Sequence, residues 1–228
     1  MTLQEFSSEF DILYNNIMSN QAPGLDEYEK SVFLTKAQED TVVDLYTGKT
    51  ISGSSFENTE ELRRYLSDLN KSAKLSSIEN TSDKIKLSEL STFYMLPKDV
   101  LFITYEAVDF VDDDKCLNKK NILVYPTTRD GYHRIKSNPF RKANHRRVLR
   151  LDYEGNIVEL VSEYNIKEYT IKYLAIPSPI ILKNLPEGIK INGESTETPC
   201  KLNPVLHRAI LDRAVRLAYS SFINAGNN

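Results

Sequence analysis

The sequence is poor in the residues that mark export, metal binding and covalent cross-linking. It has no Trp and only two cysteines, Cys116 and Cys200, which lie far apart without CxxC or Cys/His spacing. Neither a zinc site nor a disulfide framework is indicated. Met1 is followed by TLQEFSSEF, which has no basic n-region and no apolar h-region, and no apolar run approaches the roughly 20 residues that span a bilayer. We therefore expect neither a signal peptide nor a membrane partner.

Signatures of catalysis are also missing. His133 and His145 have no Ser or Cys nucleophile motif and no pair of acids beside them, which favours surface or structural histidines. The run Asp112–Asp114 lacks the interleaved ligands, the Gly and the closing Glu of a calcium loop. We expect no catalytic residue, no metal and no cofactor, and thus no enzyme.

What remains is a chain of 228 residues, long enough for one large domain or for a domain with an appendage. Its net charge of -3 and isoelectric point near 5.7 argue against a surface that clings to nucleic acid as a whole. A local basic patch is still compatible with these values. The partner has to be inferred from individual segments.

Helical periodicity dominates the N-terminal third. Apolar residues at spacings of three and four predict a helix over residues 3–18, and Asp26 and Gly48 delimit a second one as caps. The pair Asn58 and Glu61 has the spacing of a capping box before a third helix, and residues 70–83 are expected to form a polar loop. We expect the second helix to pack through Leu25, Tyr28, Val32, Val42, Leu45 and Tyr46.

Extended segments follow from residue 85. Residues 100–111 and 122–125 predict strands, and 126–131 a turn. Alternation on both sides of the EGN turn at 154–156 predicts a hairpin. A further strand over 166–175 should place Tyr169, Ile171 and Tyr173 on one face. These elements predict a β-rich region.

A last helix is expected from about Pro204 to Phe222. Asn203 can serve as its N-cap, and Pro204 stands where a helix tolerates proline best. Four of its residues are candidates for helix packing or for contact with another protein: Leu206, His207, Ile210 and Leu217. Their apolar face could cover the stripe of the first or the third helix.

The fold class expected from these elements is α+β. N-terminal helices and a C-terminal helix bundle beside a mostly antiparallel sheet or small barrel with long projecting loops. The expected divisions are a helical region 1–84, a β-rich region 85–200 and a C-terminal helix 201–228 that packs on the helical region. Together they form one subunit.

Positive charge is concentrated between residues 129 and 150, where basic residues meet almost no acids. Such a run can contact phosphate or an acidic protein surface, or it can form a solvated face, and the sequence leaves these interpretations open. The residues expected to face an anionic partner are Arg134, Lys136, Arg141, Lys142, Arg146, Arg147 and Arg150.

The order of several segments resembles a known family. NPFRKANHRRVLRLD is followed by a hairpin, then by IKEYTIKYLAIPSPIIL and NLPEGIKING, and last by the helix that begins at CKLNPVLHRAILDRAV. Over residues 137–217 this order is similar to that of the neck or head-tail connector ring proteins of crAss-like bacteriophages.

The resemblance implies a virion structural protein, assembled in the bacterial host cytoplasm, that forms a ring of twelve copies in the neck. Its partners would be copies of itself, the portal protein, other neck or tail rings, and the genomic DNA that passes through the lumen. Under this resemblance the basic residues named above face a protein partner or the DNA lumen, and the four residues of the last helix pack within the subunit or contact a ring or the portal. It implies no catalytic residues. The alternative, from another class, is a nucleic-acid-binding or processing protein that uses the basic segment 129–150.

Overall fold

The computed structural model describes residues 1–18, 24–48, 64–78, 86–111 and 120–226. The chain forms two compact units. The helical unit comprises Met1–Leu69 and Ile176–Asn228, and the sheet unit comprises Asn70–Ala175. These boundaries differ from the expected division, because segment 176–200 packs with the helices. The capping box at Asn58 and Glu61, the acidic run 112–114 and Cys116 lie outside the described residues.

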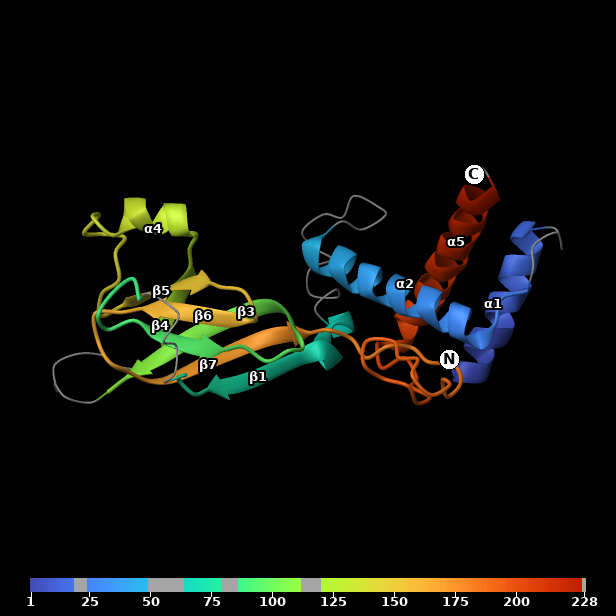
Figure 1. Ribbon diagram of the computed structural model, residues 1–228, viewed down its shortest axis with the longest axis horizontal. Coiled ribbons are helices and arrows are strands. Elements are labelled where there is room, and N and C mark those ends of the chain that lie inside the picture. Colours follow the sequence, from blue (N-terminus) through green and yellow to red (C-terminus); the bar gives the residue numbers. More distant parts are fainter. Residues whose placement is uncertain (19–23, 49–63, 79–85, 112–119, 227–228) are drawn as a thin grey trace. The chain divides into compact units, whose positions relative to one another are not determined.

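In the helical unit, α5 (His207–Gly226) packs on both α1 (Leu3–Met18) and α2 (Glu27–Thr47) (Figure 1). The predicted caps of α2 are confirmed. Asp26 accepts a hydrogen bond from the backbone of Glu29 at its N-terminus, and Gly48 ends the helix in the left-handed conformation at φ 71°. Asn203 likewise caps the 3-10 turn Pro204–Leu206 that precedes α5. No helix in the described part of the chain is long and apolar enough to cross a membrane.

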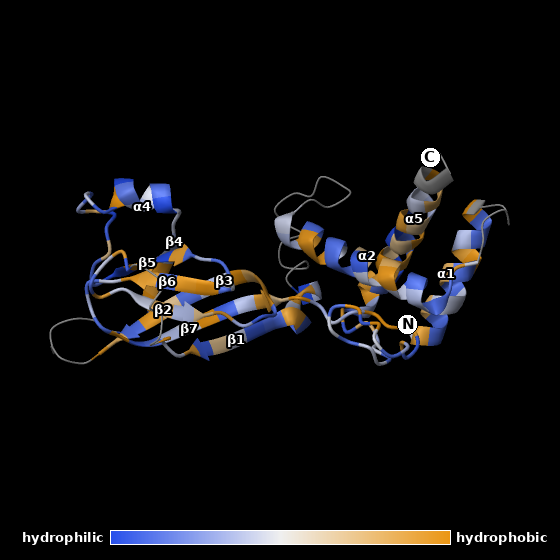
Figure 2. Ribbon diagram, viewed as in Figure 1, coloured by the Kyte–Doolittle hydropathy of each residue, from blue (hydrophilic) through white to orange (hydrophobic). Residues whose placement is uncertain are grey.

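Of the packing face expected for α2, Val42 is buried and Leu25 and Leu45 are half-buried, but the other three positions are wrong. Tyr28, Val32 and Tyr46 are exposed, whereas polar residues of another face are buried. The reason is that α2 packs against the irregular segment 176–182, whose backbone needs hydrogen-bond partners. Figure 2 shows hydrophilic and hydrophobic residues intermixed along α2.

These buried polar side chains serve the backbone of segment 176–182. The Thr35 hydroxyl accepts from Ile180 N at 3.1 Å and donates to Ile180 O at 3.3 Å. Ser31 Oγ accepts from Leu182 N at 3.0 Å, and Gln38 Nε2 donates to Ser178 O at 2.7 Å. We call Ser31, Thr35 and Gln38 the polar seam. It allows an irregular segment to be buried without orphaned backbone groups.

The sheet unit is a seven-stranded sheet in the order β1-β7-β3-β4-β5-β6-β2. Five strand pairs are antiparallel, and β4 pairs with β5 in parallel. The strands are β1 (Asn70–Leu75), β2 (Thr92–Met95), β3 (Val100–Phe110), β4 (Ile122–Pro126), β5 (Arg147–Asp152), β6 (Ile157–Val161) and β7 (Ile166–Ala175). The expected α+β class is therefore confirmed (Figure 1).

The sheet curls into a half-barrel. Beyond β1, Ser77 forms a bridge with Tyr94 of β2, and Ile78 N donates to Phe93 O at 2.8 Å, so the two edges approach each other. Tyr169, Ile171 and Tyr173 lie together in the buried cluster inside the curl, as their alternation predicted. A smaller cluster of Leu149 and Leu151 lies on the other face of β5.

Two sequence interpretations of the sheet unit are corrected. Residues 70–75, expected in a polar loop, form the edge strand β1. Their backbone pairs with β7, and the polar side chains of this segment did not indicate that pairing. The expected turn at 126–131 contains the start of a short helix, α4 (Arg129–Ile135). The hairpin of β5 and β6 is confirmed, with Gly155 and Asn156 at positive φ.

Candidate functional site

The basic run lies in the connection between β4 and β5. Adjacent parallel strands require a crossover, and here residues 127–146 provide it through α4 and a following loop. Thr128 caps α4 by accepting from Gly131 N at 3.1 Å. We call residues 127–147 the basic crossover. They include seven Lys and Arg and one acid, Asp130, a net charge of +6.

The loop of the basic crossover is held by two of its own asparagines. Asn138 Oδ1 accepts from Phe140 N at 2.9 Å, and Asn144 Oδ1 accepts from Arg146 N at 2.8 Å. Asn144 and Arg147 also exchange backbone hydrogen bonds of 2.9 and 3.1 Å. This arrangement leaves the Phe140 ring outside, where the residue is 86% exposed. The exposed ring lies next to the cationic Arg141, and Phe and Arg are both enriched in protein interfaces.

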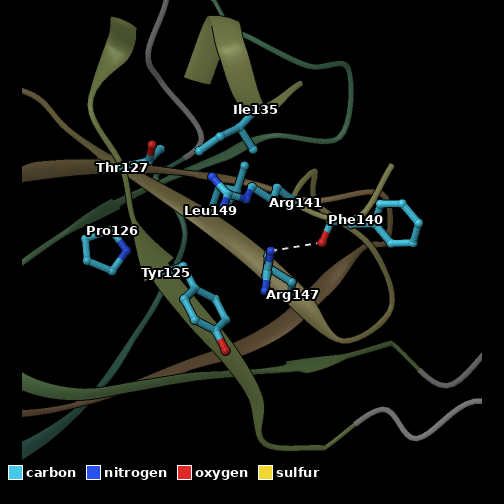
Figure 3. A pocket seen from close by; sticks show the side chains of 8 residues that line it. All are labelled: Tyr125, Pro126, Thr127, Ile135, Phe140, Arg141, Arg147 and Leu149. Carbon is cyan, nitrogen blue, oxygen red and sulfur yellow. Dashed lines mark hydrogen bonds between the residues drawn. The ribbon is translucent and has the colours of Figure 1, made fainter. Parts of the chain in front are cut away.

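A pocket of about 430 Å³ lies beside Phe140 (Figure 3). The Arg147 guanidinium lies 4.6 Å from the centre of the Tyr125 ring, and its Nη1 donates to Phe140 O at 3.2 Å. Stacking and this hydrogen bond together fix the orientation of the arginine. The pocket combines cationic and apolar side chains and is lined by Tyr125, Pro126, Thr127, Ile135, Phe140, Arg141, Arg147 and Leu149.

The structure separates the predicted basic residues into distinct environments. Four are exposed on the crossover: Arg134, Lys136, Arg141 and Arg146. Lys142 Nζ donates to Glu163 Oε1 at 2.7 Å, a partly exposed ion pair, and Arg147 forms one wall of the pocket. Arg150 differs from all of these, since it is buried within the sheet unit.

Arg150 belongs to a buried polar cluster inside the curled sheet. Its Nη1 donates to Glu106 Oε1, its Nε lies 3.0 Å from Asp152 Oδ1, and the Tyr169 hydroxyl donates to Glu106 Oε2 at 2.6 Å. Burial raises the pKa of Glu106 although Arg150 opposes this shift, and burial and Glu106 together raise the pKa of Tyr169. Arg150 is thus held inside the sheet unit by two carboxylates, unlike the exposed arginines of the crossover.

The four candidate residues of the last helix are mostly internal. Leu206, His207 and Ile210 are buried and Leu217 is half-buried. His207 Nε2 lies 2.9 Å from Leu202 O and Nδ1 lies 2.9 Å from the Met1 amine, so Nε2 carries the proton and Nδ1 accepts. Its ring packs on Phe6 with centroids 5.4 Å apart. Burial lowers the pKa of His207, which is a structural residue of the helical unit.

Sequence reasoning missed the aromatic part of the site. Phe140 is the one aromatic in the segment 134–150, and the Asn138-Pro139 pair before it is a turn signal, so its exposure could have been suspected. Tyr125 could not, because only the pairing of β4 with β5 brings it beside Arg147. The arrangement offers binding chemistry by cations and apolar rings. Among the described residues, no cluster of His, Cys, Asp and Glu could hold a metal ion.

Comparison with known proteins connects this chain to phage rings. The sequence profile described as phage tail ring protein 3/4 matches residues 1–228. Ring protein 3 of Bacteroides phage crAss001 is 48% identical over 224 residues, which cover 97% of this chain and 96% of that protein. Ring protein 4/5 of the same phage is 37% identical over 232 residues, covering 97% and 94%.

Proposed function

The chain belongs to the phage tail ring protein 3/4 family, as a ring protein of the crAss-like phage type, and from this premise we propose that it assembles as a ring in the neck of the virion. The ring connects the portal to the tail and forms part of the channel for DNA. The observation that carries the proposal is similarity to two ring proteins over nearly the whole chain. The protein acts by holding shape and contacts, without catalysis.

The surfaces of both units support a role in assembly. A ring of identical subunits needs two different patches on each subunit, one for each neighbour. The sheet unit offers the basic crossover with Phe140 at its surface. The helical unit offers exposed apolar residues on α2, such as Tyr28, Val32 and Tyr46. We propose these exposed residues as contacts to other subunits.

Twelve copies are proposed for the ring. The mass of the purified chain, alone and mixed with the portal protein of the same phage, tests this directly. We expect a species of about twelve times the 26.1 kDa subunit mass, formed alone or on the portal. A chain that stays a single subunit in both samples contradicts the proposal.

The basic crossover also allows a test against the nucleic-acid-binding alternative. A dedicated binder would bind free DNA with an affinity that falls steeply as salt rises. A connector would bind free DNA weakly, because its function depends on protein contacts. We expect weak binding even at low salt. Tight binding that weakens over several decades with salt would favour the alternative.

A further inference from the structure

Charge is divided unequally between the two units. The sheet unit contains 18 Lys and Arg against 15 Asp and Glu, and the helical unit contains 11 against 17. The excess in the sheet unit comes entirely from the basic crossover, since its net charge of +6 exceeds that of the unit. Two copies of this chain are therefore complementary in charge when the crossover of one meets the helical unit of the other.

The crossover presents more than charge. Phe140 is exposed beside Arg141, and the neighbouring pocket has the apolar residues Ile135 and Leu149 next to the guanidinium of Arg147. Phosphates of a DNA duplex are bound by cations and gain nothing from an exposed phenylalanine. Aromatic and Arg side chains together are the residues most enriched at the energetic centres of protein interfaces. The composition of this surface favours a protein partner over DNA.

The helical unit has a surface of matching chemistry on α2. Tyr28, Val32, Val43 and Tyr46 are 36–42% exposed and recur at helical spacing on one face, with Lys36 and Glu39 between them. Two acids of the same helix, Glu29 and Asp40, lie at positions bordering this face. Glu29 also accepts from Asp26 N at 3.0 Å, and Asp40 lies 3.6 Å from Arg213, so each has a second oxygen or a partly exposed carboxylate left for an arginine. We call these four apolar residues the α2 stripe. These four side chains point away from the polar seam, which lies on the buried side of the helix.

From these two surfaces we infer that the basic crossover of one copy docks on the α2 stripe of the next copy, with Phe140 as the apolar anchor. The contact joins two different patches, so its repetition generates a ring when the rotation between neighbours closes, as the proposed ring function requires. This inference rests on the proposed ring function and specifies its subunit interface. It assigns the exposed arginines of the crossover to the acidic helical unit of a second copy rather than to DNA.

Cross-linking between differently tagged copies tests the interface. In a full-length chain with Cys116→Ser and Cys200→Ser, one copy carries Ser137→Cys on the crossover and the other carries Lys36→Cys on α2. Both positions are exposed, and Phe140 and Arg141 are retained. A short bis-maleimide should join the two tags. The matched control replaces Lys36→Cys by Lys167→Cys, an exposed lysine on β7, and should give no mixed product.

A second measurement applies to variants that fold normally. Phe140→Ser combined with Arg141→Ser should reduce the fraction of chain in rings at least tenfold, with an unchanged circular dichroism spectrum. Arg208→Ser, an exposed arginine on α5, is the matched control and should leave that fraction unchanged.

The outcomes separate the inference from the function on which it rests. A ring-sized mass without the mixed product overturns the inference and leaves the ring function standing. Normal rings from Phe140→Ser with Arg141→Ser, together with loss of DNA retention, would assign the crossover to DNA and also overturn it. A chain that never exceeds one subunit, alone or with its portal, overturns both.

Discussion

The buried pair of Glu106 and Arg150 gives the sharpest test that Arg150, unlike the exposed arginines of the basic run, is an interior residue. Glu106→Gln removes the charge that balances Arg150, and both residues are less than 10% exposed. An arginine cannot release its proton, so it stays charged in the interior, with only the exposed carboxylate of Asp152 3.0 Å away. Removing one partner of a buried ion pair typically costs about 3–5 kcal/mol.

That cost should be visible as a fall in the melting temperature of the sheet unit. For a unit of this size, about 3 kcal/mol corresponds to more than roughly 10 °C. Thermal unfolding followed by circular dichroism measures it. Arg141→Met is the matched control, because it removes an arginine from the same run at an exposed position and should change stability by about 0.5 kcal/mol or less.

Arg150→Met adds a pH dependence to the same test. Without the cation, burial should raise the pKa of Glu106 further above its unfolded value. The unfolded chain then loses its proton first as pH rises, so the stability of this variant should fall from about pH 5 toward about pH 8. A stability of Arg150→Met that does not change over this pH range would contradict this pH prediction. Equal melting temperatures of Glu106→Gln and Arg141→Met would refute the assignment of Glu106 and Arg150 as a buried ion pair.

Three further predictions concern the helical unit. Thr35→Val removes both hydrogen bonds to Ile180 and should cost about 1–3 kcal/mol in urea unfolding, whereas Thr41→Val, whose hydroxyl bonds only within α2, should cost less. Burial lowers the pKa of His207, so the unfolded chain takes up this proton first as pH falls. The stability should therefore drop from about pH 7 to about pH 5, and His207→Gln should flatten this dependence in unfolding curves measured across that range. Ile210→Asp buries an unpaired charge and should destabilise the unit by about 3 kcal/mol or more, against little change for Ala209→Asp; an unchanged melting temperature would place Ile210 at an exposed face.

The elements that sequence predicted well depend on local signals. Asp26 and Gly48 cap α2 through groups within a few residues, and the EGN turn fixes the register of β5 and β6. The strand 166–175 was recognisable because its alternation matches a half-buried pleat. In each of these cases the residue types and the final structure agree without help from distant parts of the chain.

The failures have a common cause in contacts between distant residues. The buried face of α2 includes polar residues because Thr35, for example, bonds to Ile180, 145 residues further along the chain. Strand β1 has polar side chains and exists because β7 pairs with it. In both cases hydrogen bonds between distant segments decide which residues are buried or paired, and the periodicity of a single segment cannot reveal those bonds.

The positive charge of the candidate site was predictable from the sequence, but the positions of its side chains were not. The basic run was evident, but its seven predicted residues could not be sorted into exposed, paired and buried positions. Arg150 enters the interior because Glu106 of β3 and Tyr169 of β7 meet it there. The pocket beside Phe140 requires the parallel pairing of β4 and β5, which no local signal announced.

The central claim is that this chain assembles as a ring through two different surfaces of each copy. Native mass spectrometry of the full-length chain, alone and with its portal protein, measures this most directly. A single high-order species near twelve times 26.1 kDa, lost on Phe140→Ser with Arg141→Ser and kept on Arg208→Ser, is the expected result. A subunit that remains single in every mixture would contradict the claim.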